Sequence, residues 1–260
     1  MVLTTMQTVL AVASGGLVGY SLGLVGGGGS ILAVPLLVYV VGLDNPHLAI
    51  GTSAIAVALN AAANLLMHAR AGNVKWRCAG VFGVAGVAGA FLGSTLGKMV
   101  EGQRLLALFA LLMMAVGALM LRDRGRSGNA GVTLSRENLP KLLASGVLAG
   151  ALSGFFGIGG GFLIVPALML ATGMQALDAI GSSLVSVAAF GMTTAGNYAW
   201  SGLVDWPLAG LFIAGGLAGG LGGARSARLL SHHKGALTTV FAFLIFAVAL
   251  YMLARSLALL

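Results

Sequence analysis

Charged residues are scarce in this sequence. Asp, Glu, Lys and Arg together make up 8% of the 260 residues, whereas a soluble domain carries about 25%. So few charges cannot cover the water-exposed surface of a domain of this size, which excludes a soluble enzyme. Disorder is excluded as well, because it requires low hydrophobicity and high charge, and apolar residues make up 58% here. The mean hydropathy of +1.02 instead indicates a membrane protein.

Several chemical signals are also missing. Cys78 is the only cysteine, so the chain can form neither an internal disulfide nor a Cys-based zinc site. Residues 1–8 contain no Lys or Arg and therefore lack the basic region of a cleaved signal peptide. The motif H-E-x-x-H and the P-loop ending G-K-[ST] do not occur. We expect no enzymatic activity, no cofactor and no metal.

Glycine, in contrast, is abundant. It occurs 42 times, about 16% of the chain against a usual 7% or so. There is no G-X-Y period, so the chain is not a collagen. Gly15, Gly19, Gly23 and Gly27 are spaced by four residues, as in transmembrane helices whose backbones approach closely. The glycines at 89, 93 and 97 form a similar ladder, and we interpret both as packing surfaces.

The apolar stretches predict ten helical segments in an all-α, polytopic membrane protein. They are 8–25, 30–42, 47–69, 76–97, 103–121, 139–156, 161–173, 177–199, 205–229 and 236–258. A helix needs about 20 residues to cross the hydrocarbon core. The segments 30–42 and 161–173 are too short for that, so we interpret them as broken or re-entrant half-helices.

The two halves of the chain resemble each other. GYSLGLVGGGGSILAVP (19–35) aligns with GALSGFFGIGGGFLIVP (150–166), and ARAGNVKW (69–76) aligns with AWSGLVDW (199–206). This pattern predicts a repeat of five segments, with residues 1–121 as the first repeat, 122–138 as a linker loop and 139–260 as the second repeat. Because five is an odd number, the second repeat should be inverted in the membrane.

The basic residues predict the orientation. Eleven of the 14 Lys and Arg residues lie in segments 70–77, 122–141 and 225–234, which fall on one side when loops are numbered alternately. By the positive-inside rule this side is cytoplasmic, so loop 122–138 should be cytoplasmic and both termini outside. The isoelectric point of about 10.4 alone suggests a nucleic-acid partner. The charges, however, are distributed among loops between membrane-length helices, so we expect a lipid bilayer and no nucleic acid.

Two glycine-rich breaks precede the short helices, GGGGS at 26–30 and GIGGG at 157–161. Glycine leaves backbone N–H groups accessible, and the N-terminus of a helix carries about half a positive charge. Two such ends near the middle of the membrane would form an anion site. The alternative is that these glycines only permit tight packing. Ser30 in the first break corresponds to Gly161 in the second, so the two half-sites would differ chemically.

Polar residues follow on the next helix of each half. They are Ser53, Asn60, Asn64 and His68 in the first half and Ser183, Ser186, Thr193, Thr194 and Asn197 in the second. Such residues inside a membrane either line a polar path or form hydrogen bonds between helices, and both interpretations stay open. Because every carboxylate lies in a loop or at the end of a predicted helix and none in its middle, we expect a small anionic substrate rather than a cation. The candidate binding residues are Gly26, Gly27, Gly28, Gly29, Ser30, Ser53, Asn60, Asn64, Gly157, Gly159, Gly160, Gly161, Ser183, Thr194 and Asn197.

These motifs resemble the TauE/SafE family of sulfite exporters. The likeness rests on GLVGGGGSILAVPLL (23–37) and GFFGIGGGFLIVPAL (154–168), on segments 51–64 and 181–197, and on the G-x-V-x-W turns at 72–76 and 202–206. The resemblance implies a transporter of the bacterial inner membrane for sulfite, sulfonates such as sulfoacetate, or related anions. An anion channel of the same fold, a membrane-embedded enzyme and a packing subunit without transport are the alternatives. The sequence gives no expectation for the oligomeric state.

Overall fold

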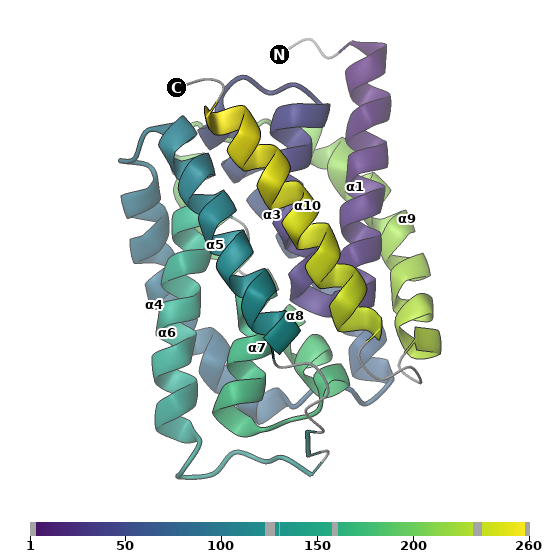
Figure 1. The fold of residues 1–260 in the computed structure, drawn as a ribbon, viewed down its shortest axis with the longest axis vertical. Helices are drawn as coiled ribbons and strands as arrows, with labels where there is room; N and C mark the ends of the chain where they lie inside the picture. Colours follow the sequence, from purple (N-terminus) through teal and green to yellow (C-terminus); the bar gives the residue numbers. More distant parts are fainter. Residues whose placement is uncertain (1–3, 123–127, 130, 158–160, 231–235, 258–260) are drawn as a thin grey trace.

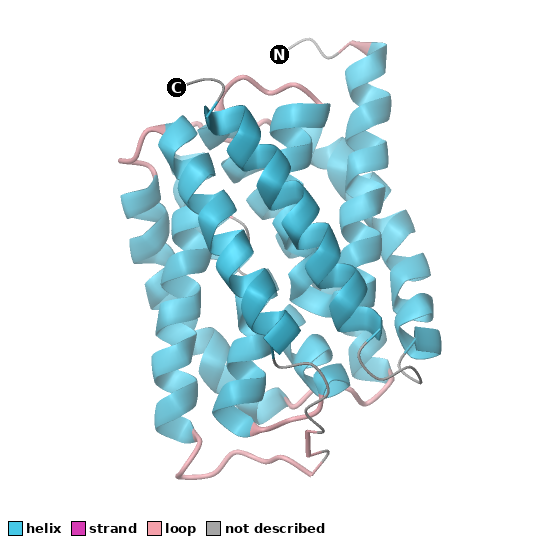
Figure 2. Cartoon of the chain, viewed as in Figure 1, coloured by secondary structure: helices cyan, strands magenta, loops and turns pink. Residues whose placement is uncertain are grey.

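The computed structural model describes residues 4–122, 128–129, 131–157, 161–230 and 236–257, and in these residues the regular structure is helical (Figure 2). Its elements are α1 (Thr5–Val25), η1 (Gly26–Leu32), α2 (Ala33–Pro35), η2 (Leu36–Val40), α3 (Pro46–Arg70), α4 (Trp76–Gly97), α5 (Gly102–Arg122), α6 (Leu139–Phe156), α7 (Gly161–Thr172), α8 (Ala176–Trp200), α9 (Trp206–Leu230) and α10 (Ala236–Leu257). The predicted segments agree with these elements to within a few residues, except at the first break.

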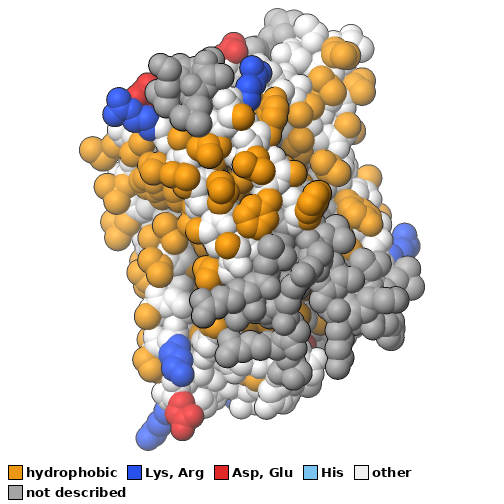
Figure 3. All heavy atoms as spheres, viewed as in Figure 1, with side chains coloured by type: hydrophobic (Ala, Val, Ile, Leu, Met, Phe, Trp, Pro, Cys, Tyr) orange, Lys and Arg blue, Asp and Glu red, His pale blue; other side chains and the backbone are white. Residues whose placement is uncertain are grey.

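Seven stretches of the described residues are long and apolar enough to cross a membrane. They are Thr5–Val40, Pro46–Arg70, Trp76–Gly97, Gly102–Leu119, Leu139–Phe156, Ala176–Trp200 and Trp206–Ser226. Two shorter apolar stretches, Gly161–Thr172 and Ile245–Arg255, accompany them. On the face in Figure 3, hydrophobic side chains spread over much of the coloured surface between the two ends, and most of the visible Lys and Arg side chains lie toward the upper and lower ends. The chain is a multi-pass membrane protein.

The first short segment differs from the expected half-helix at 30–42. It begins at Gly26 and consists of a 3-10 helix, one α-turn and a π-turn in succession. Four consecutive glycines carry no Cβ to favour the α-helical turn, and Pro35 has no N–H with which to continue an α-helical ladder. The second short segment, α7, is an α-helix of 12 residues with Pro166 inside it.

The long helices pack in pairs. Helix α1 runs along α9, α4 along α6, α3 along α8, and α5 along α10. In Figure 1, α5 and α10 cross the front of the bundle, both termini lie at its upper end, and the chain between α5 and α6 lies at its lower end. Helices α3 and α8 therefore lie between the α1–α9 and α4–α6 pairs, and both also contact the short segments.

Glycines line the contact of α1 with α9 and the contact of α4 with α6. A Cβ at Gly19 of α1 would overlap the Gly216 carbonyl of α9, and a Cβ at Gly150 of α6 would overlap the Gly86 carbonyl of α4. The ladder glycines Gly15 and Gly93 likewise meet backbone carbonyls of the facing helix. The packing interpretation of the two ladders is confirmed, because no other residue leaves room for such an approach.

Candidate functional site

Each glycine-rich break begins at a position that only glycine can occupy without strain. Gly26 ends α1 with φ +67°, and Gly157 ends α6 in the left-handed conformation with φ +68°. A Cβ at Gly26 would lie 2.7 Å from the Ile180 carbonyl oxygen of α8, and a Cβ at Gly157 would overlap Ile50 Cγ2 of α3. Each break is thus held against a long helix from the other half of the chain.

The two breaks also touch each other. A Cβ at Gly27 would lie 2.5 Å from Gly161 Cα, and a Cβ at Gly161 would overlap the Gly27 carbonyl. The structure therefore brings the start of η1 and the start of α7 into backbone contact. Gly159 and Gly160, two of the predicted site residues, lie outside the described residues.

The polar groups of the first break are bonded to neighbouring protein groups. The Gly27 N–H donates to Ser183 Oγ at 3.1 Å, and the Ser183 hydroxyl donates to the Ile180 carbonyl at 2.7 Å. The Ser30 hydroxyl donates back to the Gly27 carbonyl at 2.8 Å. Gly28 and Gly29 are buried beside them. In this arrangement the Gly27 N–H, which we expected to receive an anion, is occupied by Ser183.

Asn60 and Asn64 on α3 are the most unusual polar side chains in the interior. They are 0% and 1% exposed. The Asn64 Nδ2 donates to the Asn60 carbonyl at 2.9 Å, but Asn64 Oδ1 and both amide atoms of Asn60 have no hydrogen-bond partner among the described residues. Because a buried polar atom without a partner costs about 1–3 kcal/mol, these amides destabilise the interior in this arrangement.

The amides lie beside the glycine contact of α1 with α9. A Cβ at Gly216 would overlap Asn60 Nδ2, and a Cβ at Gly23 would lie 2.9 Å from Asn64 Oδ1. One turn further along α3, His68 Nε2 is 3.3 Å from the Gly23 carbonyl oxygen. Asn60, Asn64 and His68 of the predicted stripe therefore form one buried face of α3 directed at α1 and α9.

Most of the predicted stripe on α8 is buried. Ser183, Ser186 and Thr194 are fully buried, and Ser186 Oγ and Thr194 Oγ1 have no hydrogen-bond partner in the described part of the chain. The residue of α8 that packs against Gly86 of α4 is Phe190. A Cβ at Gly86 would overlap the Phe190 ring. In the first half Ser53 is fully buried, and its hydroxyl donates to the Ile50 carbonyl at 3.0 Å.

Comparison with known proteins decides the family. Residues 11–252 match the protein family described as "Sulfite exporter TauE/SafE". The chain belongs to the TauE/SafE family. It is similar to a "Probable membrane transporter protein" of Xylella fastidiosa (strain 9a5c), with 54% identity over 256 residues and 98% of each chain covered. It is also similar to "Probable membrane transporter protein YunE" of Bacillus subtilis (strain 168), with 27% identity over 240 residues, covering 84% of this chain and 88% of YunE.

No solved structure matches the chain. A relative from Methanocaldococcus jannaschii, "Probable membrane transporter protein MJ0441", is 30% identical over 164 residues and covers 60% of each chain. The family is one of transporters and not of enzymes. In the described residues, no group of three His, Cys, Asp or Glu side chains is arranged to hold a metal.

Asn197 of this TauE/SafE chain lies apart from the buried stripe. It is partly exposed, and its Nδ2 donates to Ser94 Oγ at 2.6 Å and to Thr95 Oγ1 at 2.9 Å on α4. The Lys98 ammonium donates to Asn197 Oδ1 at 2.8 Å and to Ser201 Oγ at 2.9 Å. Sequence reasoning did not single out Lys98. The available signal was a lysine one residue beyond the predicted end of a transmembrane helix, where a cation meets the helix dipole.

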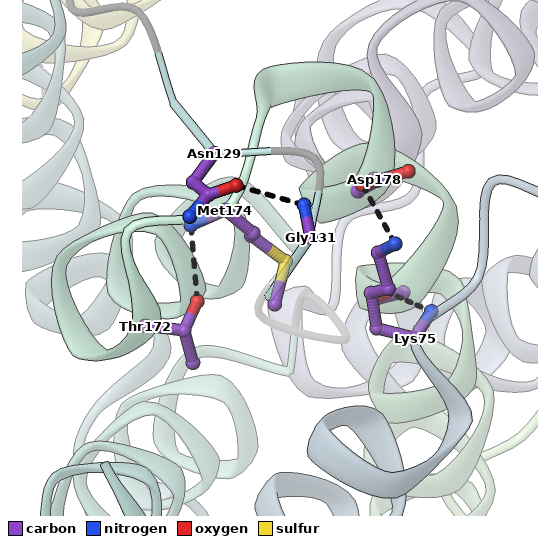
Figure 4. A network of polar contacts seen from close by, with 7 residues as sticks. Lys75, Asn129, Gly131, Thr172, Met174 and Asp178 are labelled. Atoms are coloured by element: carbon purple, nitrogen blue, oxygen red, sulfur yellow. Dashed lines mark hydrogen bonds and ion pairs between the residues drawn. The ribbon is translucent and has the colours of Figure 1, made fainter. Parts of the chain in front are cut away.

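A polar network joins the two halves at the linker end of the bundle (Figure 4). Lys75 Nζ forms an ion pair with Asp178 Oδ2 at 3.3 Å, and the Lys75 N–H donates to Ser182 Oγ at 2.9 Å. In the linker, the Asn129 N–H donates to the Gly173 carbonyl at 2.8 Å, next to the end of α7. The linker, α7 and the α3–α4 loop of this transporter therefore meet at one end.

A related contact lies between α3 and the α8–α9 loop. The Asp205 N–H donates to Thr52 Oγ1 at 2.9 Å, as the Lys75 N–H does to Ser182. The sequence patterns single out neither Thr52 nor Ser182. Only the tertiary contact reveals that these two hydroxyls hold a loop of the other half.

Proposed function

We propose that this TauE/SafE transporter moves small sulfur-containing anions, such as sulfite and sulfonates including sulfoacetate, by alternating access. The observation that carries the proposal is the contact of the two breaks, Gly27 against Gly161, beside the buried hydroxyl of Ser183. Backbone N–H groups and hydroxyls are donors that suit an anion. The described carboxylates all lie in loops or the first turn of a helix, which favours an anion over a cation. The family description, which names sulfite, supports the substrate class.

We propose that the chain consists of two inverted repeats, 1–121 and 139–260, joined by the linker 122–138. Two contacts between the two halves support this, because each one recurs between the corresponding residues with the two halves interchanged. Gly19 faces Gly216 while Gly150 faces Gly86, and these residues correspond at offsets of 131 and 130 along the chain. Gly26 on Ile180 and Gly157 on Ile50 form a second exchanged pair. Helices α1 and α6 begin at opposite ends of the bundle (Figure 1), as inversion requires.

The mechanism follows from this exchange of contacts. Each break belongs to one repeat and packs against the long helix of the other, so a rotation of one repeat against the other changes both breaks together. Such a movement would separate the Gly27 N–H from Ser183 and offer both groups to the anion. In this mechanism the proposed site comprises the breaks at 26–30 and 157–161 with Ser53 and Ser183.

The proposed path passes the buried amides. Asn60 and Asn64 supply one N–H donor group and two carbonyl oxygens without partners among the described residues, and Thr194 adds a hydroxyl from α8. A hydrated anion or one that still carries a proton can use both kinds of group. We omit Asn197 from the path, because its amide is bonded to α4 and Lys98 at the outer face of the bundle.

We further propose that the protein lies in the bacterial cytoplasmic membrane with the linker 122–138 cytoplasmic and both termini outside. The distribution of Lys and Arg supports this orientation. Single cysteines introduced into a Cys78→Ala background at 133 and at 100 test it. An impermeant thiol reagent should label residue 100 in intact cells and residue 133 only after the membrane is broken, and the reverse pattern would overturn the orientation.

Counterflow in liposomes tests transport itself. Purified protein loaded with unlabelled sulfite should accumulate labelled sulfite with saturation, and excess sulfoacetate should compete. Asn64→Leu should reduce the exchange, whereas Ser145→Ala, at a hydroxyl bonded only within the outer face of α6, should not. A channel of the same fold would give flux without counterflow, and exchange that no sulfur anion supports or inhibits would contradict the substrate class.

A further inference from the structure

A lipid-facing groove lies between α4 and α8. It has a volume of about 600 Å³ and is lined by Phe91, Met192, Thr193, Gly196, Asn197 and Trp200. Phe91 is 54% exposed, Met192 49% and Trp200 94%, although all three lie in helices that can cross a membrane. A Cβ at Gly196 would meet no atom within 4 Å, so the absence of a side chain there keeps the groove open. Its walls suit a hydrocarbon chain.

The polar end of the groove carries a positive charge. Asn197, which lines the groove, accepts from Lys98 Nζ through its side-chain oxygen at 2.8 Å and through its backbone carbonyl at 3.1 Å. The third hydrogen-bond acceptor of the ammonium is Ser201 Oγ at 2.9 Å, and the Tyr198 ring lies 5.8 Å from it. All of these partners are neutral, and no carboxylate of the described residues forms an ion pair with Lys98. The charge of Lys98 is therefore not balanced by an acidic side chain.

The depth of these residues matches a lipid headgroup. Lys98 directly follows α4, and Trp200 is the last residue of α8, so both lie where the membrane-spanning helices end. Trp and Lys are favoured at this level, with the indole and the ammonium among the headgroups. Ser201, which is exposed, adds a hydroxyl next to the ammonium.

We propose that this groove binds a phospholipid with a net negative charge. Its phosphate would lie at Lys98 and Ser201, and one acyl chain would lie along Phe91, Met192 and Trp200. The unbalanced charge of Lys98 favours an anionic headgroup over a zwitterionic one, by about fivefold for one basic side chain at the membrane surface. The site is separate from the buried amides and does not depend on the proposed substrate.

Tryptophan fluorescence tests the proposal, because the chain has three Trp residues. Trp76→Phe with Trp206→Phe leaves Trp200 as the reporter. In liposomes, brominated phosphatidylglycerol at low mole fraction should quench Trp200 about five times more effectively than brominated phosphatidylcholine. Lys98→Gln should remove this preference. Arg104→Gln is the matched control, since Arg104 lies near the same end but is exposed and paired with Glu101, and it should retain the preference.

Equal quenching by the two lipids would overturn the proposal. Quenching by neither lipid would also overturn it, because the groove would then be covered by protein, such as a second copy of the chain. Native mass spectrometry of the unsubstituted protein provides a second measurement that does not need the Trp variants. It should retain phosphatidylglycerol in preference to phosphatidylcholine, and Gly196→Leu, which fills the groove, should abolish this retention.

Discussion

The interface of α1, α3 and α9 and the interface of α4, α6 and α8 are built on the same backbone contacts. In the first, Gly19 meets Gly216, and in the second, Gly150 meets Gly86. The side chain over the contact differs, since it is Asn60 beside Gly216 and Phe190 beside Gly86. Close helix packing is therefore common to both interfaces, whereas only the first has a buried amide beside its glycine contact.

The energetic contrast explains why this difference matters. Phe190 packs against Phe82 with ring centroids 6.3 Å apart, and such a contact stabilises the interior. Asn60 at the corresponding contact has an amide without a hydrogen-bond partner among the described residues. Such an amide destabilises the interior. A chain selected for stability alone would carry an apolar side chain at both places. The retained amide argues for a functional role of the α1–α3–α9 interface.

The largest expected effect tests the shared contacts. Gly19→Ala and Gly150→Ala each force a methyl group into a facing backbone carbonyl, and overpacking of this kind costs about 3 kcal/mol. Both variants should lower the midpoint of thermal unfolding in detergent to a similar extent. Gly80→Ala and Gly210→Ala are matched controls, because a Cβ at either position meets nothing within 4 Å. A large loss in only one of the two interfaces would show that the contacts are not equivalent.

The second prediction tests the difference between the interfaces. Asn60→Leu removes an amide without partners and should raise stability by about 1 kcal/mol, while it reduces sulfite exchange about tenfold through the loss of roughly one hydrogen bond to the solute. Phe190→Leu should do the opposite, lowering stability by about 1 kcal/mol with little change in exchange per folded molecule. Thermal unfolding and counterflow on the same preparations measure both. If Asn60→Leu destabilises the protein and leaves exchange intact, the amide is a packing residue.

Much of this architecture could be predicted from local patterns, and the exceptions have physical reasons. The helices end where Gly, Pro and charged residues cluster, so their bounds followed from the sequence. The geometry of the mixed helix at 26–40 could not be predicted in this way, because it depends on the contact of Gly29 with α1. Asn197 follows Thr194 by three residues, which turns it about 60° around the helix. That rotation is enough to move its side chain from the buried face to α4.

A smaller effect is expected at the two serines that begin the buried stripes. Ser183→Ala removes the acceptor of the Gly27 N–H and should cost about 1 kcal/mol. Ser53 Oγ donates to the Ile50 carbonyl within its own helix. Ser53→Ala should therefore lower the free energy of unfolding by only a few tenths of about 1 kcal/mol. Hydrogen exchange followed by mass spectrometry should show faster exchange in a peptide covering 26–32 for Ser183→Ala alone. Equal protection in both variants would mean that Ser183 does not hold the first break.

The smallest expected effect concerns the ends of the bundle. Asp178→Asn breaks the ion pair with Lys75 and weakens the favourable placement of an acid in the first turn of α8, each worth less than about 1 kcal/mol. The loss should shrink as salt is added, because partly exposed charges are screened. Asp205 instead caps α9, with its Oδ1 accepting the Leu208 N–H at 3.0 Å. Asn caps as well as Asp, so Asp205→Asn should change the unfolding midpoint less, and with less dependence on salt. If both variants lose the same stability and respond equally to salt, charge at Asp205 contributes as much as the ion pair does, and the two loop contacts are electrostatically alike despite their different residues.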